Sequence, residues 1–325
     1  MLNWLRHFQL ERISFLLGII TATFFWWLLT KSKIIIPPLK RFLFAQIKQF
    51  KQNQVSGVYW AIKNEALQRS QANHLAQNLW SLSEIIVEPK LWIKPTATSS
   101  EEENSYIASE VSHLVPYTPE NPFISRNYGV STITPIQALQ KKTNLVISGL
   151  SGMGKTVALA NLASSLARNL PECGNLIGKA PLFFHILDTE IIQNPHQSIY
   201  DICYKALANK LPVAVIPRLA KFLRTSLKDN EAILIVDGMD ELPEIEFNTC
   251  VEFFSNLQNE LPDLQIVLSA TPFYLGKLLT INFTVLPLAA WSNNEIIKYY
   301  ETWSKLWYQY VLQNSENDKY SIDQQ

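Results

Sequence analysis

The sequence predicts an α/β protein, with a doubly wound parallel β-sheet and helices on both of its faces over residues 129–312. Five continuous apolar runs alternate with helical patterns in this part of the chain. Continuous apolar runs are typical of strands that are buried on both faces of a parallel sheet. Two of the helices start with a capping-box pattern, at Ser198-x-x-Asp201 and at Ser292-x-x-Glu295. The five runs are residues 144–148, 181–187, 232–237, 264–269 and 281–286.

A glycine-rich segment follows the first apolar run directly. Residues 149–156 match the pattern G-x-x-x-x-G-K-[ST] and lie between a predicted strand and a predicted helix. A simple glycine-rich turn would need neither the Lys-Thr pair nor this setting. In such a loop the backbone N–H groups point inward at a phosphate, and the helix N-terminus adds its dipole. Lys155 is expected to reach the β- and γ-phosphates, and the Thr156 hydroxyl to bind Mg²⁺. The predicted nucleotide-binding residues are Gly149, Leu150, Ser151, Gly152, Met153, Gly154, Lys155, Thr156 and Val157.

Three acidic residues lie at the end of the third apolar run. The run ends at Asp237, and Asp240 and Glu241 follow it closely. Ligands of open α/β sheets bind at the carboxyl ends of the strands, so Asp237 is expected to hold Mg²⁺ through its hydration shell. Asp240 is the first candidate for orienting or activating an attacking water, and Glu241 is the second. The alternative is that either acid pairs with a nearby base or caps the next helix.

The string Ile-Leu-Ile-Val-Asp-Gly-Met-Asp-Glu-Leu, residues 233–242, resembles the extended Walker B motif of NACHT-type P-loop NTPases, of the STAND signalling class. The resemblance covers residues 140–305. It implies the strand order 5-1-4-3-2, ATP and Mg²⁺ as cofactors, and ATP hydrolysis that is coupled to an oligomerisation switch. The family commonly has arginine at the position of Thr271. Because a cation near the γ-phosphate is then lost, the resemblance does not decide whether ATP hydrolysis is fast. The chain ends at Gln325, before the family's winged-helix region, which implies a shortened member or a partner that supplies this region.

An apolar run without charged residues covers residues 13–30. A helix of this length spans about 27 Å, close to the hydrocarbon thickness of a bilayer, and this predicts a transmembrane helix. More Lys and Arg residues follow the run than precede it, so its C-terminal side is expected to be cytoplasmic. A cleaved signal peptide and a buried core helix are the alternatives.

The remaining parts of the chain are predicted from their composition. Residues 40–83 show helical spacings that are interrupted near Gly57, and residues 84–93 indicate a short extended segment. Pro, Ser, Thr and an acidic run predict a linker further on. The predicted segments are an N-terminal segment (1–12), a juxtamembrane helical region (31–94), a linker (95–128) and a C-terminal tail (313–325).

The charge distribution argues against a nucleic-acid-binding protein. The net charge is zero, but residues 1–60 contain eight Lys or Arg and one acid, which leaves 20 basic and 27 acidic residues in the rest of the chain. A basic end on a mildly acidic body fits contact with anionic lipid better than contact with nucleic acid. The three cysteines are widely spaced and predict neither a disulfide framework nor a zinc site. We expect none of the five histidines to be a ligand.

Together these observations favour a single-pass membrane protein with a cytoplasmic, NACHT-like ATPase domain that acts as a nucleotide-dependent signalling switch. A nucleotide-binding scaffold with little or no turnover is the alternative, and a motor-type ATPase is a third hypothesis. The expected partners are ATP with Mg²⁺, membrane lipid through residues 13–30, and a second copy or another protein.

Overall fold

The computed structural model describes residues 18–23, 57–74, 76–77, 79–93, 132–272 and 275–312. Residues 18–23 are helical and belong to one compact unit, Met1–Ser56, and the other described residues belong to a second, Gly57–Gln325. None of the helices formed by the described residues has both the length and the apolar character needed to cross a bilayer. The predicted N-terminal segment, linker and C-terminal tail lie outside the described residues, as does most of the predicted transmembrane helix.

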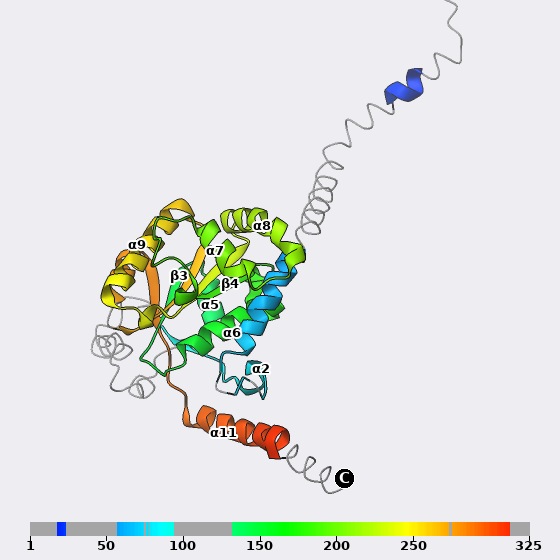
Figure 1. Cartoon of the computed structure of the whole chain (residues 1–325). Coiled ribbons are helices and arrows are strands. Elements are labelled where there is room, and N and C mark those ends of the chain that lie inside the picture. Colours follow the sequence, from blue (N-terminus) through cyan, green and yellow to red (C-terminus); the bar gives the residue numbers. More distant parts are fainter. Residues whose placement is uncertain are drawn as a thin grey trace, which may run out of the picture. The chain divides into compact units, whose positions relative to one another are not determined.

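Five parallel strands form the central sheet of the second unit (Figure 1). Their order is β4-β5-β6-β3-β7, and each neighbouring pair is parallel. Numbered along the chain and read from β7, this is 5-1-4-3-2, so the order implied by the resemblance is confirmed. The observed strand ends differ slightly from the predicted runs; β4 ends at His185 because His185 caps a short 3₁₀ helix. The strands are β3 (Asn144–Ser148), β4 (Ala180–His185), β5 (Ala232–Asp237), β6 (Gln265–Ala270) and β7 (Phe283–Pro287).

Helices connect these strands. Parallel crossovers are right-handed, so α6, which leads from β3 to β4, lies on one face of the sheet, and α8, α9 and α10 lie on the other. The helices of this part are α5 (Pro135–Leu139), α6 (Lys155–Arg168), α7 (Ile199–Ala208), α8 (Ile216–Lys228), α9 (Glu244–Glu260), α10 (Leu275–Thr280) and α11 (Asn293–Trp307). The shorter turns are η4 (Pro171–Leu176), η5 (Ile186–Asp188), η6 (Val213–Val215), η7 (Met239–Glu241) and the π-helical η9 (Tyr308–Leu312).

The two predicted helix starts are both capped. At α11 the Ser292 hydroxyl accepts from the N–H of Glu295, and the Glu295 carboxylate accepts from the N–H of Ser292, which completes the capping box. At α7 the Ser198 hydroxyl accepts from the N–H of Tyr200 instead. The shorter side chain of Asp201 makes no return bond within the described part of the chain. The capping box at α7 is therefore incomplete, although the helix begins where it was predicted.

The prediction of an extended segment over residues 84–93 is wrong at its start. Helix α2 (Leu82–Ile85) includes the first two of these residues. The Glu84 carboxylate accepts both the backbone N–H of Ser81, at 2.7 Å, and the Ser81 hydroxyl, at 2.8 Å, so the pair stabilises a helical turn. The remainder is extended and contains β1 (Leu91–Trp92), which pairs antiparallel with β2 (Thr132–Ile133).

Residues 57–93 pack against the sheet domain as part of the same compact unit. Their main helix, over residues 57–71, buries Val58, Ile62 and Ala66, and polar bonds tie this region to α6. Gln71 donates to the Ser164 hydroxyl at 2.8 Å, and Arg168 donates to the Ser83 hydroxyl at 3.2 Å. The described part of the predicted juxtamembrane region is thus integral to the core of the domain.

Lys63 is a buried cation at this junction, since only 2% of its surface is exposed. Its ammonium group donates to the Asn169 side chain at 2.5 Å and lies 4.7 Å from the centre of the Tyr59 ring. Asn169 is the C-cap of α6, so the ammonium lies near the negative end of the helix dipole. Burial nevertheless lowers the pKa of Lys63 to about 8.

We expect the stability of the wild-type protein to rise between about pH 8 and pH 10.5 because of Lys63. Between these pH values Lys63 keeps its proton in the unfolded chain and has lost it in the folded chain. The free energy of unfolding therefore increases with pH, by up to about 3 kcal/mol. Lys63→Met should remove this component of the pH dependence, and Lys221→Met, on an exposed face, should retain it. Denaturant unfolding at several pH values measures the free energy of unfolding of each protein. The same pH dependence in wild type and Lys63→Met would contradict the prediction.

Candidate nucleotide-binding site

The loop between β3 and α6 has a backbone conformation that requires glycine. Gly152 has φ of +79° and Gly154 has φ of +92°, in the left-handed region that other residues adopt only with strain. The Met153 N–H donates to the carbonyl of Leu150 at 3.3 Å, and the Leu150 N–H donates to the Met153 sulfur at 3.2 Å. These two bonds close the turn and place the following residues at the start of α6.

Six backbone N–H groups of this loop and helix start donate to no acceptor among the residues that the structure describes. They belong to Ser151, Gly152, Gly154, Lys155, Thr156 and Val157. Free N–H groups at the N-terminus of a long helix, together with the helix dipole, form a site for a phosphate group. The predicted loop residues are therefore arranged as anion binding requires.

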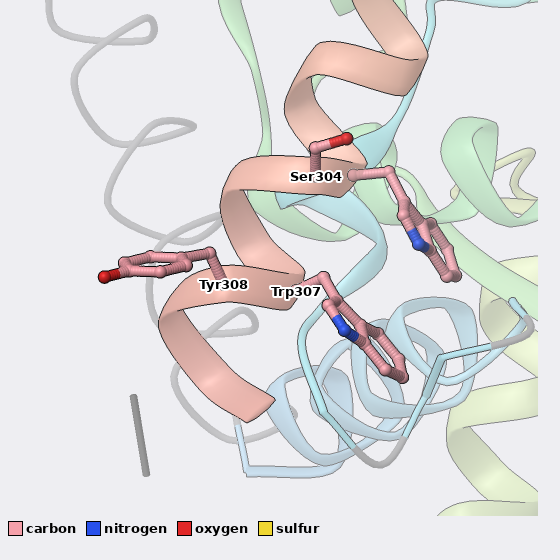
Figure 2. Close-up of a pocket in the computed structure, with 4 residues that line it drawn as sticks. Ser304, Trp307 and Tyr308 are labelled. Atoms are coloured by element: carbon pink, nitrogen blue, oxygen red, sulfur yellow. The ribbon is translucent and has the colours of Figure 1, made fainter. Parts of the chain in front are cut away.

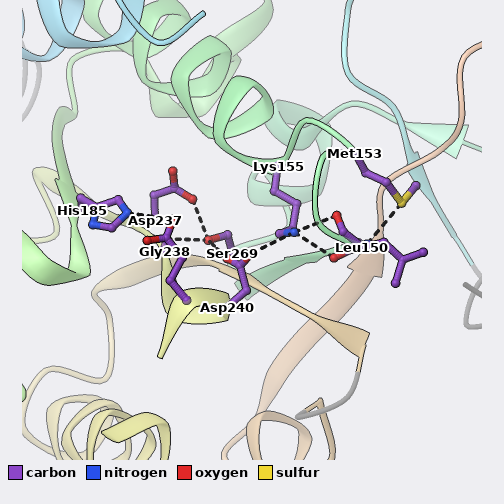
Figure 3. A network of polar contacts seen from close by, with 10 residues as sticks. Leu150, Met153, Lys155, His185, Asp237, Gly238, Asp240 and Ser269 are labelled. Atoms are coloured by element: carbon purple, nitrogen blue, oxygen red, sulfur yellow. Dashed lines mark hydrogen bonds and ion pairs between the residues drawn. The ribbon is translucent and has the colours of Figure 1, made fainter. Parts of the chain in front are cut away.

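Lys155 lies at the centre of the site and is nearly fully buried (Figure 3). Its ammonium group donates to the carbonyl oxygens of Gly149, at 2.9 Å, and Leu150, at 3.0 Å. It also forms an ion pair with Asp240 Oδ2 at 3.0 Å. All three ammonium donors thus have protein partners, so a phosphate must share or displace one of these contacts. Asp240 thus pairs with a base in the structure without nucleotide, and its role toward the attacking water stays a prediction.

Asp237 is held at the tip of β5 by Ser269 at the end of β6. The Ser269 hydroxyl donates to Asp237 Oδ1 at 2.7 Å and accepts the N–H of Gly238 at 3.0 Å, and it lies 3.4 Å from Asp240 Oδ1. Both Asp237 and Ser269 are buried. From the sequence, the place of Ser269 at the end of an apolar run predicts either a contact with the γ-phosphate or the water, or local hydrogen bonds, and the structure shows local bonds.

The predicted Mg²⁺ residues supply oxygen ligands only. Thr156 is exposed at the first turn of α6, and Asp237 is buried at the tip of β5. Within the described ranges no three His, Cys, Asp or Glu side chains form a metal cluster. Mg²⁺ is commonly bound by one or two protein oxygens together with waters and substrate phosphates, so this donor set fits it.

Glu241 faces a different partner from Asp240. Its carboxylate lies 3.4 Å from His185 Nε2, at the end of the neighbouring strand β4. The Nδ1 atom of His185 accepts the N–H of Leu187, so the neutral ring carries its proton on Nε2 and can donate it to Glu241. His185 stands beside Asp237 in the strand register. Sequence reasoning missed His185, because its place in an apolar run suggested only a core residue.

Gly238, directly after Asp237, is expected to tolerate no side chain. It has φ of +83°, and a Cβ atom there would lie 2.4 Å from His185 Nε2. We expect Gly238→Ala to lower the free energy of unfolding by about 1–3 kcal/mol through backbone strain and displacement of His185. Gly276→Ala is the control, since a Cβ atom at Gly276 meets nothing within 4 Å. Thermal or denaturant unfolding measures both; equal stability of the two variants would contradict the prediction.

The end of β6 brings no cation toward the loop. Thr271 follows this strand, and Lys277 is the only Lys or Arg in residues 229–280. The ammonium group of Lys277 binds Asn248 at 2.5 Å and Glu244 at 3.4 Å, both on α9. Lys277 is therefore engaged elsewhere and does not replace the arginine of the family.

An aromatic hollow on α11 is separate from these residues (Figure 2). It has a volume of about 450 Å³ and is lined by Trp303, Ser304, Trp307 and Tyr308. Trp303 also packs against Trp80, with ring centres 5.0 Å apart, so this contact holds α11 to the segment just before α2. The hollow contains none of the predicted site residues.

The sheet order, the loop that runs from β3 into α6, and the aspartate at the tip of β5 together define a P-loop NTPase fold. A family model described as an AAA domain matches residues 138–279, from α5 into α10, and this range includes the loop and all three acids. The matched range is thus similar to an AAA domain, and the predicted P-loop NTPase fold is confirmed at the level of the sheet and its flanking helices. A search of curated proteins finds no match to the chain.

Proposed function

We propose that this protein binds ATP with Mg²⁺ and hydrolyses it slowly. The observation that carries the proposal is the set of free N–H groups around Lys155 at the start of α6, opposite the carboxylates that follow β5. The N–H groups and the ammonium bind the phosphates, and Thr156 and Asp237 bind Mg²⁺. When bound, Mg²⁺ neutralises charge on the β- and γ-phosphates.

Asp240 is the acid that we assign to the attacking water. It lies within ion-pair distance of Lys155, the residue expected at the γ-phosphate, so a water beside that phosphate is within its reach. Glu241 is the second candidate, and its contact with His185 directs it toward β4 in the structure. A carboxylate in either position can accept a proton from water while the water oxygen bonds to the γ-phosphorus and ADP leaves.

Binding and turnover test the proposal together. The full chain should bind ATP in the presence of Mg²⁺ and release phosphate, and both Lys155→Ala and Asp237→Ala should weaken binding and slow turnover. Calorimetry measures the affinity and a phosphate-release assay measures the rate. Equal ATP binding by all three proteins would contradict a nucleotide site at this loop.

A nucleotide-binding scaffold with little or no turnover is the second candidate function. It is favoured by Thr271 and by the engagement of Lys277 with α9, which leave the end of β6 without a cation for the γ-phosphate. Tight ATP binding without phosphate release, even at high protein concentration, would establish this function in place of the first.

The narrower assignment to a NACHT-type switch of the STAND class is also a proposal. Its support is the residue string around Asp237 and the strand order, together with the ion pair between Lys155 and Asp240. ATP must perturb this pair, so bound and free states differ at the η7 turn that carries both acids. Self-association that depends on ATP, measured by light scattering over a range of concentrations, supports the switch; a constant molar mass contradicts it.

We further propose that residues 13–30 anchor the chain in a membrane with the AAA domain on the cytoplasmic side. The support is the length of the uncharged run and the excess of Lys and Arg after it. Deletion of residues 13–30 should release the protein from membranes, and alkaline extraction of the full chain should not.

A further inference from the structure

A cationic surface covers the exposed side of α8. The helix contains four basic residues and no acidic residue, although the protein as a whole has no net charge. All four are exposed, and none of them forms an ion pair with any residue that the structure describes. By contrast, Lys205 and Lys210 nearby pair with Glu190 and Asp188. The four residues are Arg218, Lys221, Arg224 and Lys228.

The fold fixes the direction of these cations. The opposite side of α8 is apolar and buried, so the helix cannot rotate to bring the charges inward. Helix α8 packs against α7 and β5, and Figure 1 shows it at the periphery of the domain. The buried apolar residues are Leu219, Phe222, Leu223 and Leu227. The charged side is therefore a permanent surface of the folded domain.

An exposed apolar tip precedes this helix directly. Val213, in the short turn η6, is 86% exposed, the highest fraction among the large apolar side chains of the described residues. Pro212 and Ala214 on either side of it are also exposed. An exposed aliphatic tip beside four cations that pair with no described residue is a combination that a surface facing only water does not require.

This combination fits the surface of an anionic bilayer. Each Lys or Arg near such a surface contributes about 1 kcal/mol, and an aliphatic side chain gains by entering the headgroup boundary. Nucleic acid would satisfy the four charges but would leave the Val213 tip in water. The competing occupant is an acidic surface on a second copy of the chain. Residues 229–263, which follow α8, could supply that surface, because they are acidic and contain no Lys or Arg. That stretch carries a comparably exposed apolar residue, Ile245, 81% exposed, which provides a matched control.

We propose that η6 and the exposed side of α8 form a membrane-contact surface that binds anionic lipid headgroups. Val213 enters the headgroup region, and Arg218, Lys221, Arg224 and Lys228 bind the phosphate and carboxylate groups of the lipids. This surface is distinct from the nucleotide site and requires no membrane-spanning segment. If the chain is also anchored, the contact sets the orientation of the domain on the bilayer.

A fluorescent label at position 213 tests the proposal on the full chain. Val213→Cys places a single accessible thiol on the described surface, because the three native cysteines are buried, and burial raises the pKa of Cys203 and of Cys250 to about 12. The label is a nitrobenzoxadiazole group, whose emission rises when it leaves water. The labelled protein is mixed with vesicles of phosphatidylcholine alone or with phosphatidylserine added. Ile245→Cys, labelled in the same way, is the control.

The expected result is a rise in emission at position 213 only with phosphatidylserine, reversed by high salt. The label at position 245 should not respond. Replacing Arg218, Lys221 and Arg224 together by glutamate should weaken the lipid response by at least about 100-fold, since three favourable charges are lost and three repulsive ones are added. ATP binding by the same variant shows whether the domain is folded and the nucleotide site is intact. A failure of the nucleotide site is therefore distinguished from a loss of lipid binding.

Three outcomes would overturn the proposal. The first is no response at position 213, or an equal response with phosphatidylcholine alone. The second is an unchanged lipid response in the glutamate variant with normal ATP binding. The third is a response at positions 213 and 245 that depends on protein concentration without vesicles, which would assign the surface to contact between copies.

Discussion

Replacement of Lys155 by alanine is expected to reduce ATP affinity and phosphate release by about 10²–10³-fold. The ammonium group is the only side-chain cation that the described structure places within the loop, and it bonds to Gly149, Leu150 and Asp240. Its loss removes the charge that should face the β- and γ-phosphates. It also leaves the Asp240 carboxylate without its ion pair near the phosphates, which adds repulsion. Calorimetry and phosphate release measure the two effects.

Asp240→Asn is the matched control for this variant. It keeps the size of the side chain but removes the charge that holds Lys155 in the structure without nucleotide. We therefore expect ATP affinity to stay equal or to increase, and phosphate release to decrease. Circular dichroism confirms folding of both variants. Normal ATP binding by folded Lys155→Ala would show that the loop is not the nucleotide site, and unchanged turnover by Asp240→Asn would move the catalytic assignment to Glu241.

Removal of residues 57–93 is expected to abolish stable folding of the sheet domain. Several large side chains from this region are almost completely buried, and four of them belong to the same apolar core as α6 and the sheet. Each contributes roughly 1.5–3 kcal/mol, so their joint loss is on the order of the whole stability of a domain, about 5–15 kcal/mol. The large buried side chains are Val58, Ile62, Trp80, Leu82, Ile85 and Leu91.

Two fragments with the same C-terminus test this expectation. Residues 129–312 correspond to the domain that the sequence predicts, and residues 57–312 add the region that the structure packs onto it. We expect the longer fragment to be a soluble monomer with a cooperative thermal transition, and the shorter one to aggregate or to lack a transition. If the shorter fragment melted cooperatively at the same temperature, the predicted boundary at residue 129 would be correct and the packing of residues 57–93 dispensable.

The sheet and the phosphate loop could be predicted because their signals are local. Continuous apolar runs predicted all five strands, and the spacing of Gly149, Gly154, Lys155 and Thr156 predicted the strand–loop–helix unit. The strand order came from the family resemblance instead, since a run of apolar residues says nothing of its neighbours in a sheet. The start of α2 was missed even though Ser81 and Glu84 have capping-box spacing, because the apolar residues around them favoured an extended segment.

The contacts that complete the site could not be predicted from local signals. Lys155 and Asp240 are far apart in sequence, and so are Ser269 and Asp237 or His185 and Glu241. Their meeting depends on β3, β4, β5 and β6 ending at one edge of the sheet in a particular register. Candidate acids could therefore be named from the sequence, but their partners could not.

The sequence by itself determined the kind of protein: a chain with a phosphate loop, acids at the end of a buried strand, and a parallel sheet between helices. The tertiary structure decided which groups are engaged and which are free. It pairs Asp240 with Lys155, turns Glu241 toward His185, builds residues 57–93 into the core, and leaves the cations of α8 without an ion pair to any described residue. The physical reason is that backbone conformation and burial follow from short-range patterns, whereas charge pairing depends on distances that only the folded chain establishes.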